Sequence, residues 1–289
     1  MGIINVTPDS FSDGGLFLEP ERAIRHARDL VARGADLLDA GGESTRPGAR
    51  AVTREQELAR VAPVIAGLGN VGVPISIDTS KVMVAEAALD AGAEIVNDVT
   101  ALRAEPELAH LCAQRECNVV LMHMLGDPRT MQDNPTYEDV VDDVKAFLAE
   151  RIEAATGAGV AEERIGVDPG IGFGKTLDHN LELLARLAEL RDLGRTIVVG
   201  TSRKSFLGSL TGREVTDRLG GTIASSVLAL RAGADILRVH DVAEVGQAVR
   251  VAEAMPRDRG RPCRGASSAR PFGARSSALW RHPPASRRR

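Results

Sequence analysis

The chain has 289 residues, of which 43% are hydrophobic, 26% charged and 3% aromatic. This balance is that of a globular protein, and the scarcity of aromatic residues predicts an aliphatic core. The first residues show no cationic segment followed by an apolar stretch of signal-peptide length, and no run approaches the roughly 18 apolar residues of a membrane span. We therefore expect a cytoplasmic protein with no membrane partner.

Charge is distributed unevenly along the chain. The formal net charge is −4, yet residues 257–289 contain ten Arg and one Asp, which leaves residues 1–256 with a charge of −13. The basic segment is rich in Pro, Ser and Gly and has no apolar period, so we expect residues 257–289 to form a disordered tail. Such a tail can bind nucleic acid or anionic surfaces, but a non-functional extension is the competing interpretation, and we expect no nucleic-acid partner.

Three segments of the chain share one pattern. Each begins with Gly, Ala and an acidic residue and continues with two apolar residues and a polar one, at positions 34–39, 92–97 and 233–238. Gly suits the left-handed position that ends a helix, and a short apolar strand follows after a turn. The spacings of 58 and 141 residues are close to two and five units of about 28 to 29 residues, a normal length for a repeat of strand and helix.

The same alternation extends over residues 1–256. We predict apolar strands at residues 2–6, 37–40, 75–77, 95–96, 119–122, 165–167, 196–199 and 236–239. Segments with helical periodicity lie at residues 20–32, 55–68, 82–91, 137–155, 177–190, 222–231 and 242–254. Eight buried strands joined by helices indicate an α/β protein with a single (β/α)8 TIM barrel. The alternative, an open doubly wound sheet, would carry Gly-x-Gly-x-x-Gly after the first strand, where this chain reads Thr-Pro-Asp-Ser-Phe-Ser.

In a barrel of this kind the chemistry takes place at the carboxyl ends of the strands, and here those ends are polar. A single Asp at such a place is more often a helix cap or turn residue than a ligand, and we favour that interpretation for Asp39, Asp98 and Asp241. The remaining strand-end residues divide into two chemical groups. One suits the edge of a flat, nitrogen-rich heterocycle and consists of Asp78, Asn97, Asp168 and Lys204.

The second group suits a phosphate or diphosphate. Arg forks match anionic oxygens, and an amide oxygen is a ligand that Mg²⁺ accepts. The residues of this group are Asn5, Thr45, Arg46, Arg238 and His240. The two groups together predict a site for a heterocycle joined to a diphosphate.

Two further features imitate known sites. The run from Asp168 to Lys175 resembles a phosphate-binding P-loop, but Pro169 stands where that motif needs its first Gly. His123 lies between two Met residues with no second His or Cys at ligand spacing, so we interpret it as a hydrogen-bonded packing histidine.

Two long motifs carry a family resemblance. Residues 1–15, which read MGIINVTPDSFSDGG, and residues 41–48, GGESTRPG, resemble the two signatures of dihydropteroate synthases. Shorter motifs follow in the order typical of that family: SIDTSK at 76–81, ND at 97–98, LMHM at 121–124, DPGIGFGK at 168–175, TSRKS at 201–205 and RVHDV at 238–242. The resemblance covers residues 1 to about 255.

The resemblance implies a transferase reaction. The amine of 4-aminobenzoate attacks the methylene of 6-hydroxymethyl-7,8-dihydropterin diphosphate, which gives 7,8-dihydropteroate and pyrophosphate. It implies that Asp78, Asn97, Asp168 and Lys204 bind the pterin, that Asn5 is associated with Mg²⁺, and that Thr45, Arg46, Arg238 and His240 hold the diphosphate. Pro47, Phe173, Ser202 and the stem of Lys204 would frame the aminobenzoate. The family also implies a homodimer.

Two alternatives stay open. A methyltetrahydrofolate:corrinoid methyltransferase shares the ring recognition of Asp78 and Asn97, but the loops that contain Arg46 and Lys204, which suit an anion and an aryl acid, argue against it. A paralogue that binds a pterin without turnover is the other, and the presence of every diphosphate ligand argues against that interpretation.

Overall fold

The computed structural model describes residues 1–7, 19–45, 49, 51–127 and 130–255. The predicted tail, Arg46 and Pro47 lie outside the described residues. Eight parallel strands stand side by side in chain order. They are β1 (Gly2–Asn5), β2 (Leu38–Gly41), β3 (Ile75–Asp78), β4 (Ile95–Asp98), β5 (Asn118–Met122), β6 (Ile165–Asp168), β7 (Thr196–Val199) and β8 (Ile236–Leu237).

The sheet closes because the segment after β8 pairs with β1. Gly2 forms a parallel bridge with Val239. The backbone N–H of Ile3 donates to the Val239 carbonyl at 3.1 Å, and the Val239 N–H donates to the Met1 carbonyl at 3.0 Å. The predicted TIM barrel is therefore confirmed, with all eight strands at the predicted places.

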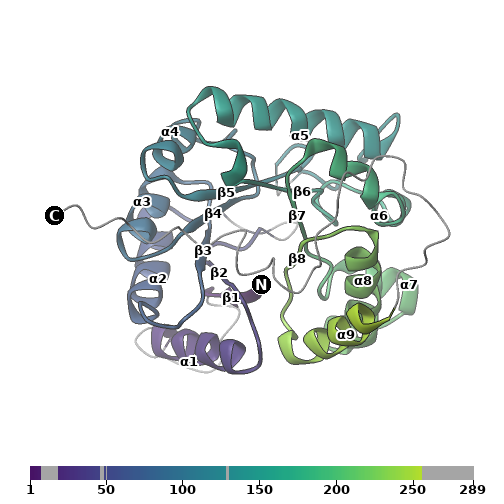
Figure 1. Cartoon of the computed structure of the whole chain (residues 1–289), viewed down its shortest axis with the longest axis horizontal. Helices are drawn as coiled ribbons and strands as arrows, with labels where there is room; N and C mark the ends of the chain where they lie inside the picture. The colour runs from purple at the N-terminus through teal and green to yellow at the C-terminus, as the bar shows by residue number, and fades with distance from the viewer. Residues whose placement is uncertain (8–18, 46–48, 50, 128–129, 256–289) are drawn as a thin grey trace.

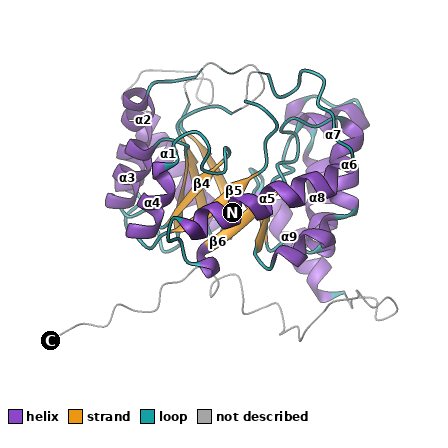
Figure 2. Cartoon of the chain, turned by 90° about the horizontal axis from the view of Figure 1, so that it is seen from above, coloured by secondary structure: helices purple, strands orange, loops and turns teal. Residues whose placement is uncertain are grey.

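Helices surround the strands, as Figure 1 shows. Figure 2, turned by 90°, shows the strands in the middle of the molecule between helices on either side. The α-helices are α1 (Glu19–Ala32), α2 (Arg54–Gly67), α3 (Val82–Asp90), α4 (Glu107–Gln114), α5 (Val140–Gly157), α6 (Leu177–Ala185), α7 (Ser205–Thr211), α8 (Leu219–Ala232) and α9 (Val242–Ala254). Short 3-10 helices are η2 (Glu162–Arg164), η3 (Leu187–Leu193) and η4 (Val215–Asp217).

The three sequence repeats end three helices in the same way. Gly34, Gly92 and Gly233 have φ values of 99°, 104° and 115°. After each Gly, the N–H of the following Ala donates to a helix carbonyl five residues earlier, always at 2.9 Å. This left-handed Gly satisfies carbonyls at the helix end and redirects the chain into the next strand. The repeat therefore sets the geometry of entry into β2, β4 and β8.

Some helices differ from the predicted ranges. The predicted helix 137–155 begins at Val140 because the Asp139 side chain accepts N–H groups of Val141 and Asp142 and so caps it. The predicted helix 177–190 divides at Arg186 into α6 and η3. Helices α4 and α7, of 8 and 7 residues, were not predicted, because about two turns of helix give only a weak periodic signal.

The interior of the barrel is filled by a small aliphatic cluster of Leu37, Ile95, Val120 and Val198. Ile95 lies two residues before Asn97, so both side chains point to the same face of β4. The cluster thus forms an apolar floor below the polar strand ends. A larger cluster packs the outer faces of the strands against the helices.

Candidate active site

Polar side chains form a row across neighbouring strands at the mouth of the barrel. The strand register places Asn5 beside Gly41 and Gly41 beside Asp78. It places Asp78 in turn beside Asn97. Gly41 contributes no side chain, and a Cβ built there would lie 3.4 Å from the Cβ of Asp78. Three residues predicted from separate motifs therefore share one edge of the mouth.

Arg238 reaches this row from the segment after β8 and bridges two carboxylates. Its Nε donates to Oδ2 of Asp39 at 2.6 Å, and its Nη2 donates to Oδ2 of Asp78 at 2.8 Å. Burial opposes the guanidinium charge, but Asp39 and Asp78 outweigh it and raise the pKa of Arg238. Burial raises the pKa of Asp78 to about 7 against the opposing charge of Arg238. Asp78 therefore holds its proton more tightly than a carboxyl in water does.

The interpretation of Asp39 as a cap or turn residue is wrong. Asp39 lies within β2, its side chain is 0% exposed, and its Oδ2 also accepts from Asn97 Nδ2 at 3.3 Å. It is neither a helix cap nor a turn residue, because it fixes Arg238 and Asn97 together. Its other oxygen, Oδ1, is buried and has no hydrogen-bond partner within the described part of the chain. A buried acceptor of this kind suits an N–H donor from a ligand or from water.

Lys204 and Asp168 carry opposite charges and interact electrostatically with one another. Burial lowers the pKa of Lys204 to about 8, although Asp168 opposes this shift. Burial raises the pKa of Asp168, against the charge of Lys204 and the N–H of Gly170. The Lys204 ammonium donates to the carbonyl of Ile171 and lies 4.7 Å from the centroid of the Phe173 ring. The structure therefore brings Lys204 and Phe173 into contact.

Ser202 and His240 connect the loops after β7 and β8. The Ser202 hydroxyl lies 3.0 Å from Nδ1 of His240, and it accepts the backbone N–H of His240 at 3.2 Å. Each residue thereby fixes the position of the other. Because Arg238 is two residues before His240, the same contact also steadies the strand end that carries Arg238.

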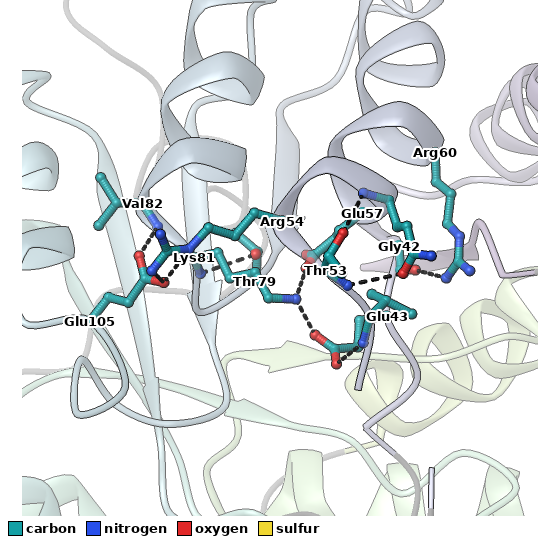
Figure 3. A network of polar contacts seen from close by, with 12 residues as sticks. Gly42, Glu43, Thr53, Arg54, Glu57, Arg60, Thr79, Lys81, Val82 and Glu105 are labelled. Carbon is teal, nitrogen blue, oxygen red and sulfur yellow. Dashed lines mark hydrogen bonds and ion pairs between the residues drawn. The ribbon is translucent and has the colours of Figure 1, made fainter. Parts of the chain in front are cut away.

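The segment after β2 is anchored by a network of buried and half-buried charges (Figure 3). Lys81 Nζ lies 2.6 Å from Glu43 Oε2 and 2.5 Å from Glu57 Oε2. Arg60 Nη1 donates to the Gly42 carbonyl at 2.7 Å. Glu43, a polar strand-end residue, is therefore engaged in a structural ion pair. This network fixes the start of the segment that leads to Thr45, which is partly exposed.

Comparison with known proteins decides which family has this arrangement. The model of the family described as "Pterin binding enzyme" matches residues 1–240. Dihydropteroate synthase of Escherichia coli (strain K12) is 47% identical over 255 residues, which cover 88% of this chain and 90% of the relative. The chain belongs to the dihydropteroate synthase family.

Solved structures agree with this family assignment. Dihydropteroate synthase of Xanthomonas albilineans with 4-aminobenzoic acid has a TM-score of 0.83 at 50% identity and covers 89% of this chain and 93% of its own. The same enzyme in complex with 7,8-dihydropteroate has a TM-score of 0.80 at 46% identity, with coverage of 89% and 94%. The resemblance drawn from the sequence motifs is confirmed.

Within this dihydropteroate synthase family member, most of the predicted site residues lie at one mouth. The described ones are Asn5, Thr45, Asp78, Asn97, Asp168, Phe173, Ser202, Lys204, Arg238 and His240, and each lies at or after the carboxyl end of a strand. His123 is buried and bonded to Lys175, with Nδ1 2.8 Å from Nζ, as expected of a packing histidine. Lys175 was not predicted as a site residue, because in the sequence it stands out only as the last residue of the run that resembles a P-loop.

Proposed function

We propose that this chain acts as a dihydropteroate synthase. The amine nitrogen of 4-aminobenzoate forms a bond to the methylene carbon of 6-hydroxymethyl-7,8-dihydropterin diphosphate, the bond from that carbon to oxygen breaks, and pyrophosphate leaves. The nitrogen then loses one proton to water or to the departing pyrophosphate. One observation carries the proposal. Ring-binding acceptors and the anion-binding Arg238 meet at one mouth, where Arg238 and Asp78 are in direct contact.

The pterin is proposed to bind against Asp78, Asn97, Asp168 and Lys204. Carboxylates accept N–H groups from the ring, and Lys204 donates to a ring acceptor. In the described structure these groups already have protein partners, such as the Ile171 carbonyl for Lys204. Binding therefore exchanges protein hydrogen bonds for ligand ones and leaves few buried groups unpaired.

The diphosphate is proposed to lie against Arg238, His240, Thr45 and Arg46. Asp39 and Asp78 accept from Nε and Nη2 of Arg238, and the guanidinium has further N–H groups that can reach anionic oxygens. If the carbon–oxygen bond loosens before attack, negative charge grows on the departing group. Fixed cations stabilise that charge without reorganising during the reaction.

Mg²⁺ is proposed as the cofactor. The described residues contain no group of three or more His, Cys, Asp or Glu that could hold a metal ion, and Asn5, at the end of β1, offers one amide oxygen as a ligand. This sparse set fits Mg²⁺, which keeps several waters and usually binds through one or two protein oxygens together with substrate phosphates. When bound, it would neutralise charge on the departing diphosphate.

The aminobenzoate is proposed to lie beside Phe173, Ser202, Pro47 and the stem of Lys204. The contact between the Lys204 ammonium and the Phe173 ring supports this placement. An aromatic amine is neutral at pH 7 and attacks through its own lone pair, so the proposal needs no general base.

A homodimer in the cytoplasm completes the proposal. Large hydrophobic side chains are exposed in and after α7, where Leu210 is 51%, Val215 47% and Leu219 40% exposed. Such a group of exposed apolar residues suits a subunit interface. None of the described helices is both long and apolar enough to span a membrane.

The test is pyrophosphate release by the purified protein with both substrates and Mg²⁺. Turnover that requires 4-aminobenzoate supports the proposal. Tight binding of the pterin diphosphate with no pyrophosphate release under any condition would favour the non-catalytic paralogue instead. Lys204→Ala should lower kcat/KM, with a loss of roughly 2 kcal/mol or more of transition-state stabilisation, because the substitution removes a buried charged contact.

A further inference from the structure

The loop between β6 and α6 is held by side chains at every carbonyl from Ile171 to Gly174. Gln132 Nε2 donates to the Gly172 carbonyl at 2.8 Å, and the Tyr137 hydroxyl donates to the Gly174 carbonyl at 2.7 Å. The four donors, in order along the loop, are Lys204 Nζ, Gln132 Nε2, Lys175 Nζ and the Tyr137 hydroxyl. This loop contains Phe173, so the position of its ring is set by a backbone that has little freedom.

Three of these donors have no place in the proposed chemistry, and of the three only Lys175 is buried, whereas Gln132 is exposed and Tyr137 is half-buried. Lys175 is 3% exposed. Its Nζ donates to the Phe173 carbonyl at 3.0 Å and lies 2.8 Å from Nδ1 of His123. Burial lowers the pKa of Lys175 well below its usual value. Burial, followed by the charge of Lys175, lowers the pKa of His123 to about 2. His123 is therefore neutral at pH 7, and its Nδ1 can accept from Lys175.

His123 is itself firmly placed at the end of β5. Its backbone N–H donates to the Asp168 carbonyl at 2.9 Å. Its ring packs edge-on against Phe147, with centroids 4.8 Å apart. Lys175 thus links a fixed acceptor on β5 to the carbonyl of the residue that faces Lys204.

We infer that Lys175, with His123 as its acceptor, is a positioning residue that sets the Phe173 ring for the aryl acid substrate. An apolar side chain would fill the same space without the cost of burying an amine. The amine is explained by the two acceptors that it satisfies, the Phe173 carbonyl and His123 Nδ1. The inference rests on the proposed function, because it assigns Phe173 to the aminobenzoate pocket.

The test is the kinetic effect of Lys175→Met, which keeps the length of the side chain but removes the donor. We expect KM for 4-aminobenzoate to rise about tenfold, while KM for the pterin diphosphate stays within about twofold and kcat within about threefold. A role in stability alone would lower the melting temperature without separating the two KM values. A wild-type protein with no turnover would instead refute the proposed function.

Arg151→Met is the matched control. Arg151 Nε donates to the Ala101 carbonyl at 2.8 Å, so it also holds a loop carbonyl, but in the loop after β4. We expect this variant to lose stability with both KM values within about twofold of wild type. The same rise in KM for 4-aminobenzoate in both variants would overturn the inference.

A second pair of variants decides the matter if Lys175→Met does not fold. His123→Asn keeps an acceptor near the position of Nδ1, whereas His123→Leu removes it. We expect His123→Leu to raise KM for 4-aminobenzoate about tenfold and His123→Asn to restore it to within about threefold of wild type. Equal KM values in these two variants would overturn the inference.

Discussion

Arg238 depends on two carboxylates for its position. Asp39 holds Nε and Asp78 holds Nη2, and these bonds aim one guanidinium across the mouth of the barrel. Lys has a single ammonium group and no fork, so it cannot bridge two carboxylates in the same geometry and still face a diphosphate. At this position the shape of the cation matters as much as its charge.

Arg238→Lys should therefore lower kcat/KM roughly 30-fold, which corresponds to a loss of about 2 kcal/mol of transition-state stabilisation. The measurement is initial-rate kinetics of pyrophosphate release. A Lys variant that retains nearly full activity would show that charge alone suffices here.

Asp78 should give the folded protein a specific pH dependence. Its pKa of about 7 in the folded state lies above the ordinary value of 3.8, so the folded state holds this proton more tightly than the unfolded state does. The stabilising contribution is then fully present below pH 3.8 and is lost as the pH rises through 7.

Asp78→Asn removes this dependence. Between about pH 5 and about pH 8, the free energy of unfolding of wild type should fall relative to that of the variant by about 1 kcal/mol or more. Urea denaturation of both proteins at several pH values measures the difference. A constant difference across this range would contradict the assigned pKa.

The sequence predicted Asp78 and Asn97 because each ends an apolar strand, which is a local signal. Asp39 gives the same local signal at the end of the first repeat, but its role could not be predicted from it, because its partner Arg238 is 199 residues away in the chain. Only the closed barrel brings β2 and the end of β8 to the same mouth. The role of Lys175 could not be predicted for the same reason, since its acceptor His123 lies 52 residues away in the chain, just after β5.

At the scale of elements, the loop from β6 to α6 is fitted tightly against the end of β5. Gly170 has a φ of +68°, and a Cβ added there would lie 1.8 Å from the His123 carbonyl oxygen. No rearrangement of a flexible side chain can relieve that contact, because the obstacle is backbone. The Gly-rich run that resembles a P-loop is thus explained by close packing.

Gly170→Ala should therefore destabilise the fold by about 2 kcal/mol or more, through backbone strain and the clash together. Gly194→Ala is the control, since Gly194 has nearly the same φ of +66° with nothing within 4 Å of the added Cβ. It should cost only about 1 kcal/mol, the strain of the left-handed backbone. Equal losses in the two variants, measured by chemical denaturation, would show that the close contact with His123 is unimportant.

The sequence predicted strands better than helix ends. The three Gly-Ala repeats located the entries to β2, β4 and β8 because a left-handed Gly is a local requirement. The extent of α6 was predicted wrongly because the helix ends at Arg186, which forms an ion pair with Asp139, 47 residues away in the chain. Such tertiary contacts have no periodic signature.

At the scale of the whole molecule, the proposed homodimer can be tested through the exposed residues near α7. Leu210→Glu places a charge near the exposed Val215 and Leu219. It should shift the protein from dimer to monomer in sedimentation velocity experiments. Met83→Glu is the control, because Met83 is 37% exposed but lies on α3, across the molecule from α7 (Figure 1). A monomeric wild type, or a dimeric Leu210→Glu variant, would contradict the proposed interface.

The central claim is that one barrel mouth joins a pterin methylene to an aryl amine and expels pyrophosphate. The most direct test is to measure both products in the same reaction, with 7,8-dihydropteroate quantified by mass spectrometry. We expect equal amounts of 7,8-dihydropteroate and pyrophosphate, each dependent on both substrates. Pyrophosphate without dihydropteroate, or neither product from folded protein, would contradict it.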